Sequence, residues 1–282
     1  MRNFPKKLAL KGIWSSSQKL VMGALLLHIL CIFVYERFIH KLKTLFLLSK
    51  YMTLYKIFKL FLRQDVTIKV KGKVIRAKYA DIWYWLLCED EDFEVKILEN
   101  DICFIKGGTS LLFPKEVMPI MWEDFEKYKV FDYQDKVVLD IGGFCGETAV
   151  IFHKWWKCRK VIVFEPNPRY HDYIKRNVAL NGVNADIYPQ AVTNSNFARI
   201  LAENDIDIAK IDCEGCEVYL LNVPCYLLRR VPEYVLEIHS FHLYMQLRSK
   251  FKECGFKVKV CSVLKLKPTI IITVKAWLTN VS

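Results

Sequence analysis

The sequence predicts an α/β fold in which a mostly parallel sheet carries helices on both of its faces. From residue 136 onward, short apolar runs rich in Val and Ile alternate with segments of helical periodicity. Such alternation requires crossover connections, and these place the strands parallel to one another. Hydrophobic residues make up 53% of the 282 residues, so a core large enough for such a sheet is available.

The strands predicted in this region number seven, with helices between most of them. The helices begin near Glu147, cover Arg169–Asn181 and Val218–Leu221, and lie near Leu243–Cys254. Ligands of such sheets bind at the carboxyl ends of the strands, so the loops that follow the strands are expected to form the site. The predicted strands are Val137–Asp140, Lys160–Glu165, Ala185–Tyr188, Ile208–Asp212, Tyr234–Glu237, Phe256–Cys261 and Thr269–Leu278.

The region before this sheet has a different pattern. Over Val66–Pro114, short runs are β-branched or alternate in polarity, and turn residues such as Gly107–Gly108 separate them. We predict a small antiparallel sheet, interrupted by a helix near Ala80–Cys88 and followed by a helix over Lys115–Tyr128. The chain is then divided into an N-terminal segment over 1–63, a β-rich subdomain over 64–130 and the main domain over 131–282.

Residues 1–63 carry the basicity of the chain. They hold 12 Lys and Arg against one acid, Glu36, whereas the remaining residues hold 30 basic and 29 acidic side chains. A near-neutral main domain argues against a nucleic-acid partner, because phosphate binding requires a basic face. The apolar run Leu20–Tyr35 would span ~24 Å as a helix, which is short of a ~30 Å hydrocarbon core.

Three interpretations of Leu20–Tyr35 stay open: a short signal anchor, a helix in the membrane interface, and an apolar helix packed on the protein. The next segment, Leu45–Arg63, places basic residues at helical spacings, which is typical of an amphipathic interfacial helix. A natural start at Met52 is a further alternative. We predict a cytoplasmic protein that is membrane-associated through residues 1–63.

The ten cysteines form no regular framework, which predicts reduced thiols. Cys213 and Cys216 have a CxxC spacing. A zinc ribbon would need a second such pair, and the sequence has none. Thioredoxin-like chemistry is not favoured either, because the loop that carries this pair has another explanation.

The strongest motif is the loop Asp140–Glu147, DIGGFCGE, between a buried strand and a helix. Gly142, Gly143 and Gly146 allow the chain to turn sharply while lying against a ligand, and the start of the helix offers free N–H groups. A dinucleotide loop would have the pattern G-x-G-x-x-G, which is absent. A carboxylate at Asp140 would repel pyrophosphate and suit a cationic ligand with an ammonium and a sulfonium, such as S-adenosylmethionine.

Glu165 follows the second strand in the segment VFEPNP. An acid at the end of this strand can accept both hydroxyls of a ribose. The same arrangement occurs in NAD sites, so Glu165 indicates a nucleoside without identifying it. Pro166 and Pro168 end the strand, and Asn167 is placed to cap the following helix.

Two more acidic motifs follow the fourth and fifth strands. Asp212, Glu214 and Glu217 lie close together in the first of them, and carboxylates there can orient a cofactor or act as general base. Paired carboxylates could also hold a metal, but no matching cluster of His or Asp accompanies them, so we predict no metal site. Glu237 and His239, with His242 nearby, follow the fifth strand; alternation puts Glu237 and His239 on one side, where a histidine is a candidate base.

Four segments in this order resemble the successive motifs of FkbM-type methyltransferases. They are VVLDIGGFCGETA, VIVFEPNPRYHDYIKRNVALNGV, DIAKIDCEGCEVYLL and YVLEIHS, and the resemblance does not extend to residues 1–65. It implies a class I methyltransferase Rossmann-like fold, a seven-stranded sheet with its antiparallel strand at the edge, and S-adenosylmethionine as cofactor. It also implies O-methylation of a hydroxyl on a sugar, glycolipid, lipid or polyketide-like small molecule.

The resemblance also implies roles for single residues. Asp140, Gly142 and Gly146 would line the methionine part of the cofactor, and Glu165 would hold the ribose. Asp212 and Glu214 match the K-I-D-x-E-G block of the family, close to the methyl group. The family often has Ala-Asn where this chain has Gly143 and Phe144, so Phe144 is free to pack on the ligand instead. The remaining cofactor-binding candidates are Gly143, Glu147 and Asn167.

The sequence thus predicts an O-methyltransferase with Glu214 or His239 as base and Asp212 beside them. Two alternatives from other classes stay open. A nicotinamide-dependent oxidoreductase would share the argument for Glu165 but lacks the pyrophosphate loop. A cofactor-binding module without turnover, held at a membrane by residues 1–63, would bind the cofactor and transfer nothing.

Overall fold

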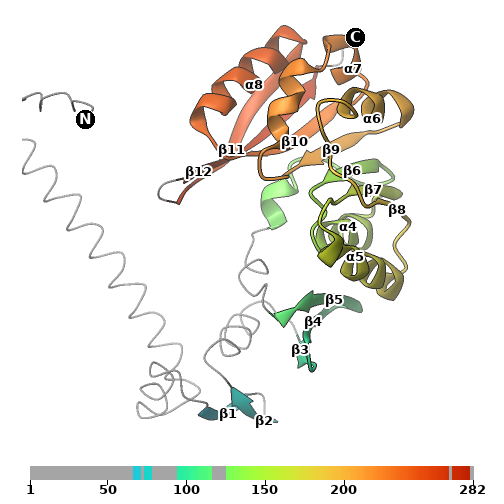
Figure 1. The fold of residues 1–282 in the computed structure, drawn as a ribbon, viewed down its shortest axis with the longest axis vertical. Coiled ribbons are helices and arrows are strands. Elements are labelled where there is room, and N and C mark those ends of the chain that lie inside the picture. The colour runs from blue at the N-terminus through green and yellow to red at the C-terminus, as the bar shows by residue number, and fades with distance from the viewer. Residues whose placement is uncertain (1–65, 71–72, 78–93, 116–124, 267–268, 280–282) are drawn as a thin grey trace, which may run out of the picture. The chain divides into compact units, whose positions relative to one another are not determined.

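The computed structural model describes residues 66–70, 73–77, 94–115, 125–266 and 269–279 (Figure 1). The segments Leu20–Tyr35 and Leu45–Arg63, the predicted helix at Ala80–Cys88 and most of the predicted helix at Lys115–Tyr128 lie outside these residues. By its contacts the chain divides into two units, residues 1–90 and residues 91–282. In the first unit, β1 (Val66–Val70) pairs with β2 (Lys73–Ala77) as an antiparallel hairpin.

The second unit contains a seven-stranded sheet, as predicted, in the order β11-β12-β10-β9-β6-β7-β8. Parallel pairing joins β8 to β7, β7 to β6, β6 to β9 and β9 to β10. The strands are β6 (Val137–Ile141), β7 (Lys160–Phe164), β8 (Ala185–Tyr188), β9 (Ile208–Ile211), β10 (Glu233–Ile238), β11 (Phe256–Leu266) and β12 (Thr269–Leu278).

The expectation that the antiparallel strand lies at the edge of this sheet is wrong. β12 is the antiparallel strand, and it is inserted between β10 and β11, with both of which it pairs. Only two residues separate β11 from β12, so the two strands must form an antiparallel hairpin. β12 is the member of this hairpin that pairs with β10, and β11 is left at the edge.

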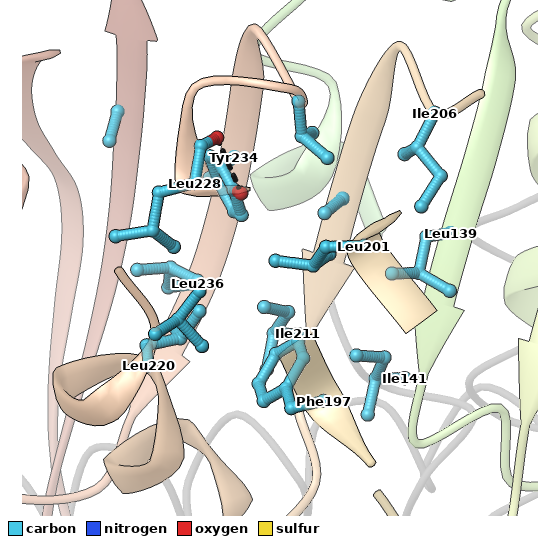
Figure 2. Packing of buried hydrophobic residues seen from close by; sticks show 14 of the residues in the cluster. Leu139, Ile141, Phe197, Leu201, Ile206, Ile211, Leu220, Leu228, Tyr234 and Leu236 are labelled. Carbon is cyan, nitrogen blue, oxygen red and sulfur yellow. Dashed lines mark hydrogen bonds between the residues drawn. The ribbon is translucent and has the colours of Figure 1, made fainter. Parts of the chain in front are cut away.

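Helices cover both faces of the sheet, as predicted. On one face, α4 contacts β6 and β7, and α5 contacts β8. On the other face, alternate strand residues such as Leu139, Ile141 and Ile211 pack with α6, α7 and α8 in one buried cluster (Figure 2). The helices are η2 (Phe125–Tyr128), α4 (Glu147–Lys154), α5 (Pro168–Asn181), α6 (Phe197–Glu203), η3 (Cys216–Asn222), α7 (Cys225–Leu228) and α8 (Phe241–Glu253).

A three-stranded antiparallel sheet, made of β3 (Glu94–Ile97), β4 (Asp101–Lys106) and β5 (Thr109–Pro114), packs on α5. The Asn177 side chain accepts a hydrogen bond from Leu112 N and donates to Leu112 O, at 2.7 and 2.8 Å. Asn181, one turn later, forms the same pair of bonds with Ser110. The backbone of β5 is thereby satisfied by side chains, which avoids an open strand edge.

We expect Asn177→Ala to lower the free energy of unfolding by about 3 kcal/mol, because it leaves the buried polar groups of Leu112 and the Cys145 carbonyl without these partners. Urea unfolding measures the loss. Asn184→Ala is the matched control, since the exposed Asn184 donates one bond to Arg159 O. Equal stabilities of the two variants would contradict the role given to Asn177.

The prediction of reduced thiols is wrong at four positions. Disulfides join Cys213 to Cys216 and Cys225 to Cys254. The turn into η3 brings the first pair together, and the start of α7 meets the end of α8 at the second, which the scattered sequence positions do not reveal. Within the described ranges, no helix has the length and apolar character needed to cross a membrane.

Candidate functional site

A cavity of about 880 Å³ lies at the carboxyl ends of the parallel strands, where the sequence predicted the site. Loops after β6, β7, β8 and β9 contribute to its walls, and so do the end of β10 and the β11–β12 hairpin. Of the predicted cofactor residues, Gly142, Glu147, Glu165 and Asp212 line the cavity, as do the acids Glu214 and Glu237. Four others lie outside its lining: Asp140, Gly143, Gly146 and Asn167.

The glycine loop is shaped by close contacts with its neighbours. Gly142 has φ +82°, and a Cβ there would lie 1.8 Å from the backbone oxygen of Asp212. The loops after β6 and β9 therefore touch, and only glycine fits between them. Gly143 and Gly146 face the protein instead of the cavity: a Cβ would lie 2.2 Å from Val163 Cγ1 and 3.1 Å from Ile174 Cα, respectively.

Asp140, a predicted cofactor residue, does not line the cavity. Its side chain is fully buried, and its Oδ1 lies 2.9 Å from the ammonium of Lys210. The two residues are directly opposite in the pairing of β6 with β9, so their side chains share one face of the sheet. Burial acts to lower the pKa of Lys210, but Asp140 and Asp212 outweigh it and the pKa is raised. Lys210 therefore stays charged and neutralises Asp140, and it also donates to Gly142 O at 2.8 Å.

Glu165 joins two loops of the site. Its carboxylate accepts hydrogen bonds from Phe144 N at 3.0 Å and from Asn167 N at 2.8 Å. Burial raises the pKa of this carboxyl, while the two N–H donors act in the opposite direction. Asn167 has the capping role that the sequence predicted, since its Oδ1 accepts from Arg169 N at the start of α5. Its side chain is exposed outside the cavity, so direct contact with a ligand there is not indicated.

Phe144 and Glu147 complete this side of the cavity. Phe144 adopts φ +43°, and its ring centroid lies 4.2 Å from that of Tyr170, so part of the ring packs on the protein itself. Glu147 begins α4 and is buried, with Oε2 accepting from Cys145 N at 3.1 Å. A carboxylate at this position is favoured by the helix dipole.

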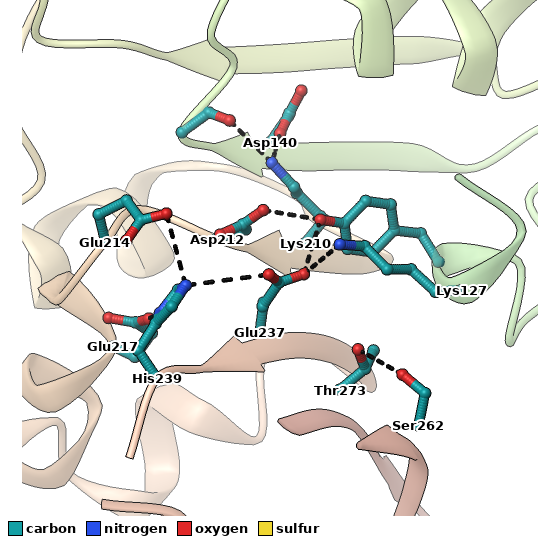
Figure 3. A network of polar contacts seen from close by, with 12 residues as sticks. Lys127, Asp140, Lys210, Asp212, Glu214, Glu217, Glu237, His239, Ser262 and Thr273 are labelled. Carbon is teal, nitrogen blue, oxygen red and sulfur yellow. Dashed lines mark hydrogen bonds and ion pairs between the residues drawn. The ribbon is translucent and has the colours of Figure 1, made fainter. Parts of the chain in front are cut away.

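The acids after β9 and β10 gather around His239, as Figure 3 shows. His239 Nδ1 lies 2.8 Å from Glu217 Oε1, and Nε2 lies 3.5 Å from Glu214 Oε1 and 3.8 Å from Glu237 Oε1. Glu237 in β10 and His239, the first residue after this strand, thus point to the same side, as the alternation predicted. His242 is exposed on α8 and is not among the residues that line the cavity.

His239 is poorly suited to act as a base in this arrangement. The hydrogen bond that His239 donates to Glu217 raises the pKa of the imidazole to about 9, against the opposing effect of burial, and the charge of Glu214 adds to the rise. At neutral pH the ring is therefore doubly protonated and positively charged. Of the three predicted catalytic residues, Asp212 and Glu214 therefore remain as the groups that can accept a proton.

Two residues of η2 reach this cluster, and sequence reasoning missed both. The Tyr128 hydroxyl donates to Asp212 Oδ2 at 2.7 Å and lies 3.2 Å from Glu237 Oε2, while the Lys127 ammonium forms an ion pair with Glu237. They are more than 80 residues from Asp212 in the chain, so no local pattern could reveal them. Lys210 was also missed, although a lysine inside the apolar strand sequence IAKI is a signal of a buried partner.

The family model described as "Methyltransferase FkbM domain" matches residues 184–258. The matched region contains the acidic motifs after β9 and β10, and the glycine loop and Glu165 precede it. A protein of Sulfolobus islandicus rod-shaped virus 1, described as "Uncharacterized protein 158B", is 30% identical to the chain over 121 residues. The aligned segment covers 43% of this chain and 72% of the viral protein.

Several solved structures are similar in fold. A putative transferase of Pyrococcus horikoshii has 13% identity and a TM-score of 0.47, over 69% of this chain and 82% of its own. Precorrin-6y C5,15-methyltransferase of Geobacter metallireducens has 17% identity and a TM-score of 0.42, over 60% and 91%. TYW2 of M. jannaschii, in complex with AdoMet, has 16% identity and a TM-score of 0.44, over 64% and 87%.

Proposed function

Because the chain belongs to the FkbM methyltransferase family, we propose that it transfers a methyl group from S-adenosylmethionine to a hydroxyl oxygen of a small acceptor. The observation that carries this proposal is the meeting of three motifs in one cavity. Gly142 after β6, Glu165 after β7 and Asp212 after β9 all line it. Each comes from a different strand end, as expected for a ligand that lies across the edge of the sheet.

The charge of the cavity suits a cationic cofactor. Its lining includes five carboxylate residues, Glu147, Glu165, Asp212, Glu214 and Glu237, against two lysines. One of those lysines is neutralised by Asp140 and the other pairs with Glu237. When bound, S-adenosylmethionine supplies a methyl group on a positively charged sulfur. The excess of carboxylates supports a ligand with an ammonium and a sulfonium over a nucleotide with a pyrophosphate.

Within this proposal, Glu165 binds the ribose hydroxyls and the loop at Gly142 admits the methionine part. Phe144 and Phe164 offer apolar surface in the same lining. Asp212 and Glu214 orient the acceptor hydroxyl and take its proton, since His239 holds one already. These residues mainly align reacting groups, and alignment contributes a large part of the rate in such transfers.

The acceptor is proposed to be a sugar, glycolipid or lipid that carries a hydroxyl. The β11–β12 hairpin adds Val263, Leu264 and Ile271 to the cavity, together with the hydrogen-bonded hydroxyls of Ser262 and Thr273. Such a wall suits a molecule with both apolar and hydroxyl-bearing parts. The basic and apolar composition of residues 1–63 fits an acceptor that resides at an anionic lipid surface.

Titration calorimetry of the full-length chain with S-adenosylhomocysteine tests the proposal. We expect one site per chain with a micromolar dissociation constant, and no change in NADH fluorescence when the same protein is added. Incubation with labelled S-adenosylmethionine and cell-envelope extract should then label an acceptor. Absence of S-adenosylhomocysteine binding by the folded chain would overturn the proposal. Binding without any labelled product would favour a binding module instead.

A further inference from the structure

We propose that Asp212, Glu214 and His239 form a binding site for one divalent cation at the part of the cavity that Asp212 and Glu214 line. The fold brings these three residues together, although the sequence predicted no metal site. One ligand atom from each, a carboxylate oxygen or an imidazole nitrogen, lies within 4.8 Å of the other two. A cation with ligand distances of about 2.0–2.3 Å can bridge atoms at this spacing with small side-chain adjustments.

The orientation of the imidazole is the second observation that points to a cation. Nδ1 of His239 is held at 2.8 Å by Glu217, whose side chain is fully buried. The opposite nitrogen, Nε2, is directed toward the acids, is itself buried and has no hydrogen-bond partner among the described residues. Metal-binding histidines almost always have this arrangement, with the second ring nitrogen bonded to a carboxylate.

The surrounding residues hold the carboxylates in place. Tyr128 donates to Asp212 at 2.7 Å, and Lys127 pairs with Glu237, whose Oε1 lies 3.8 Å from Nε2 and is placed to serve as a fourth ligand. Glu214 is different, because its side chain is 83% exposed. The proposed site is therefore rigid on its buried side and open toward the cavity, where water or an acceptor can complete the coordination.

The donor set indicates the class of cation. One imidazole nitrogen with two or three carboxylate oxygens suits Mn²⁺, Fe²⁺ or Zn²⁺ better than Ca²⁺, which prefers six to eight oxygens. The functional role rests on the proposed function. A hydroxyl of the acceptor bound to the cation would have a lowered pKa, so that its O–H bond breaks, the proton passes to the second carboxylate oxygen of the exposed Glu214 and the electron pair stays on the acceptor oxygen.

A proton on Nε2 is the competing occupant of this position, because a doubly protonated His239 can pair with Glu214 and Glu237 without any metal. The experiment is therefore Mn²⁺ binding to the chelator-treated, full-length chain, measured by electron paramagnetic resonance, with Zn²⁺ in competition. We expect one bound Mn²⁺ per chain with a micromolar dissociation constant. Absence of binding below millimolar Mn²⁺ would overturn the inference in favour of the proton.

Variants make the assignment specific. Glu214→Gln and His239→Gln should each weaken Mn²⁺ binding by more than about tenfold, and Glu217→Gln by about 10- to 100-fold through the ring it orients. Glu203→Gln is the control, because Glu203 is exposed on α6 and pairs with Arg199. Glu214 is itself exposed, so its variant should fold normally even if His239→Gln does not. Unchanged binding by Glu214→Gln would also overturn the inference.

The same preparations are titrated with S-adenosylhomocysteine, so the two proposals fail separately. Absence of Mn²⁺ binding by the unsubstituted chain, with intact S-adenosylhomocysteine binding, rejects the cation site alone. Mn²⁺ binding without S-adenosylhomocysteine binding rejects the methyltransferase proposal and leaves the cation site standing.

Discussion

Replacing Lys210 with methionine is expected to lower the free energy of unfolding by about 3–5 kcal/mol. Lys210 is 2% exposed, and its ammonium lies 2.9 Å from the carboxylate of the fully buried Asp140. Methionine has a similar length but no charge, so the variant leaves Asp140 buried beside an apolar group. It also removes the bond to Gly142 O, which ties the glycine loop to β9. The substitution should therefore destabilise the glycine loop at the cavity as well as the core.

Urea unfolding of the full-length chain measures this effect. Lys160→Met is the matched control, because Lys160 pairs with Asp186 at 2.6 Å while both side chains are more than one third exposed. Such a surface pair is worth about 0–1 kcal/mol. The double variant Asp140→Asn with Lys210→Met removes both charges and should regain part of the loss. If Lys210→Met is as stable as Lys160→Met, the buried pair does not have the role assigned to it.

Replacing Glu165 with alanine is expected to weaken S-adenosylhomocysteine binding by about 10- to 150-fold. This range corresponds to a lost binding free energy of ~1.5–3 kcal/mol, the net contribution of a hydrogen bond to a charged group. The carboxylate accepts from Phe144 N and Asn167 N, so it fixes the loops after β6 and β7 in addition to its proposed contact with the ribose. Alanine removes both effects at once.

Calorimetric titration checks this loss, with Asn167→Ala as the informative comparison. Asn167 caps α5 and lies outside the lining of the cavity. Its variant should lose about 1 kcal/mol of stability, as is typical of a lost helix cap, and should keep its affinity within about twofold. Wild-type affinity in Glu165→Ala would remove Glu165 from the site. A large loss of affinity in Asn167→Ala would restore Asn167 as a binding residue.

Much of the fold could be predicted because its signals are local. The apolar runs VVLD and VIVF are long enough to specify buried parallel strands, and Gly107–Gly108 specifies the tight turn between β4 and β5. The positions of Gly142 and Glu165 at strand ends were predictable for the same reason. Parallel strands present their carboxyl ends at one edge of a sheet, so residues far apart in the chain are expected there together.

Other features depend on which strands become neighbours. Asp140 lies in an apolar strand, and its ion pair with Lys210 depends on the placement of β9 beside β6, which brings the two residues opposite each other. The position of β12 between β10 and β11 and the bond between Cys225 and Cys254 depend on such packing too. None of these features leaves a periodic signal in the chain.

The sequence by itself therefore determined the seven-stranded α/β sheet, the glycine loop at Gly142 and the acid at Glu165. Only the tertiary structure decided that Asp140 is neutralised by Lys210, that His239 is held by Glu217 against Glu214, and that Tyr128 reaches Asp212. The physical reason is the range of the interactions. Periodicity and turn chemistry act between residues close in the chain, whereas ion pairs and hydrogen bonds in the site join residues up to 110 positions apart.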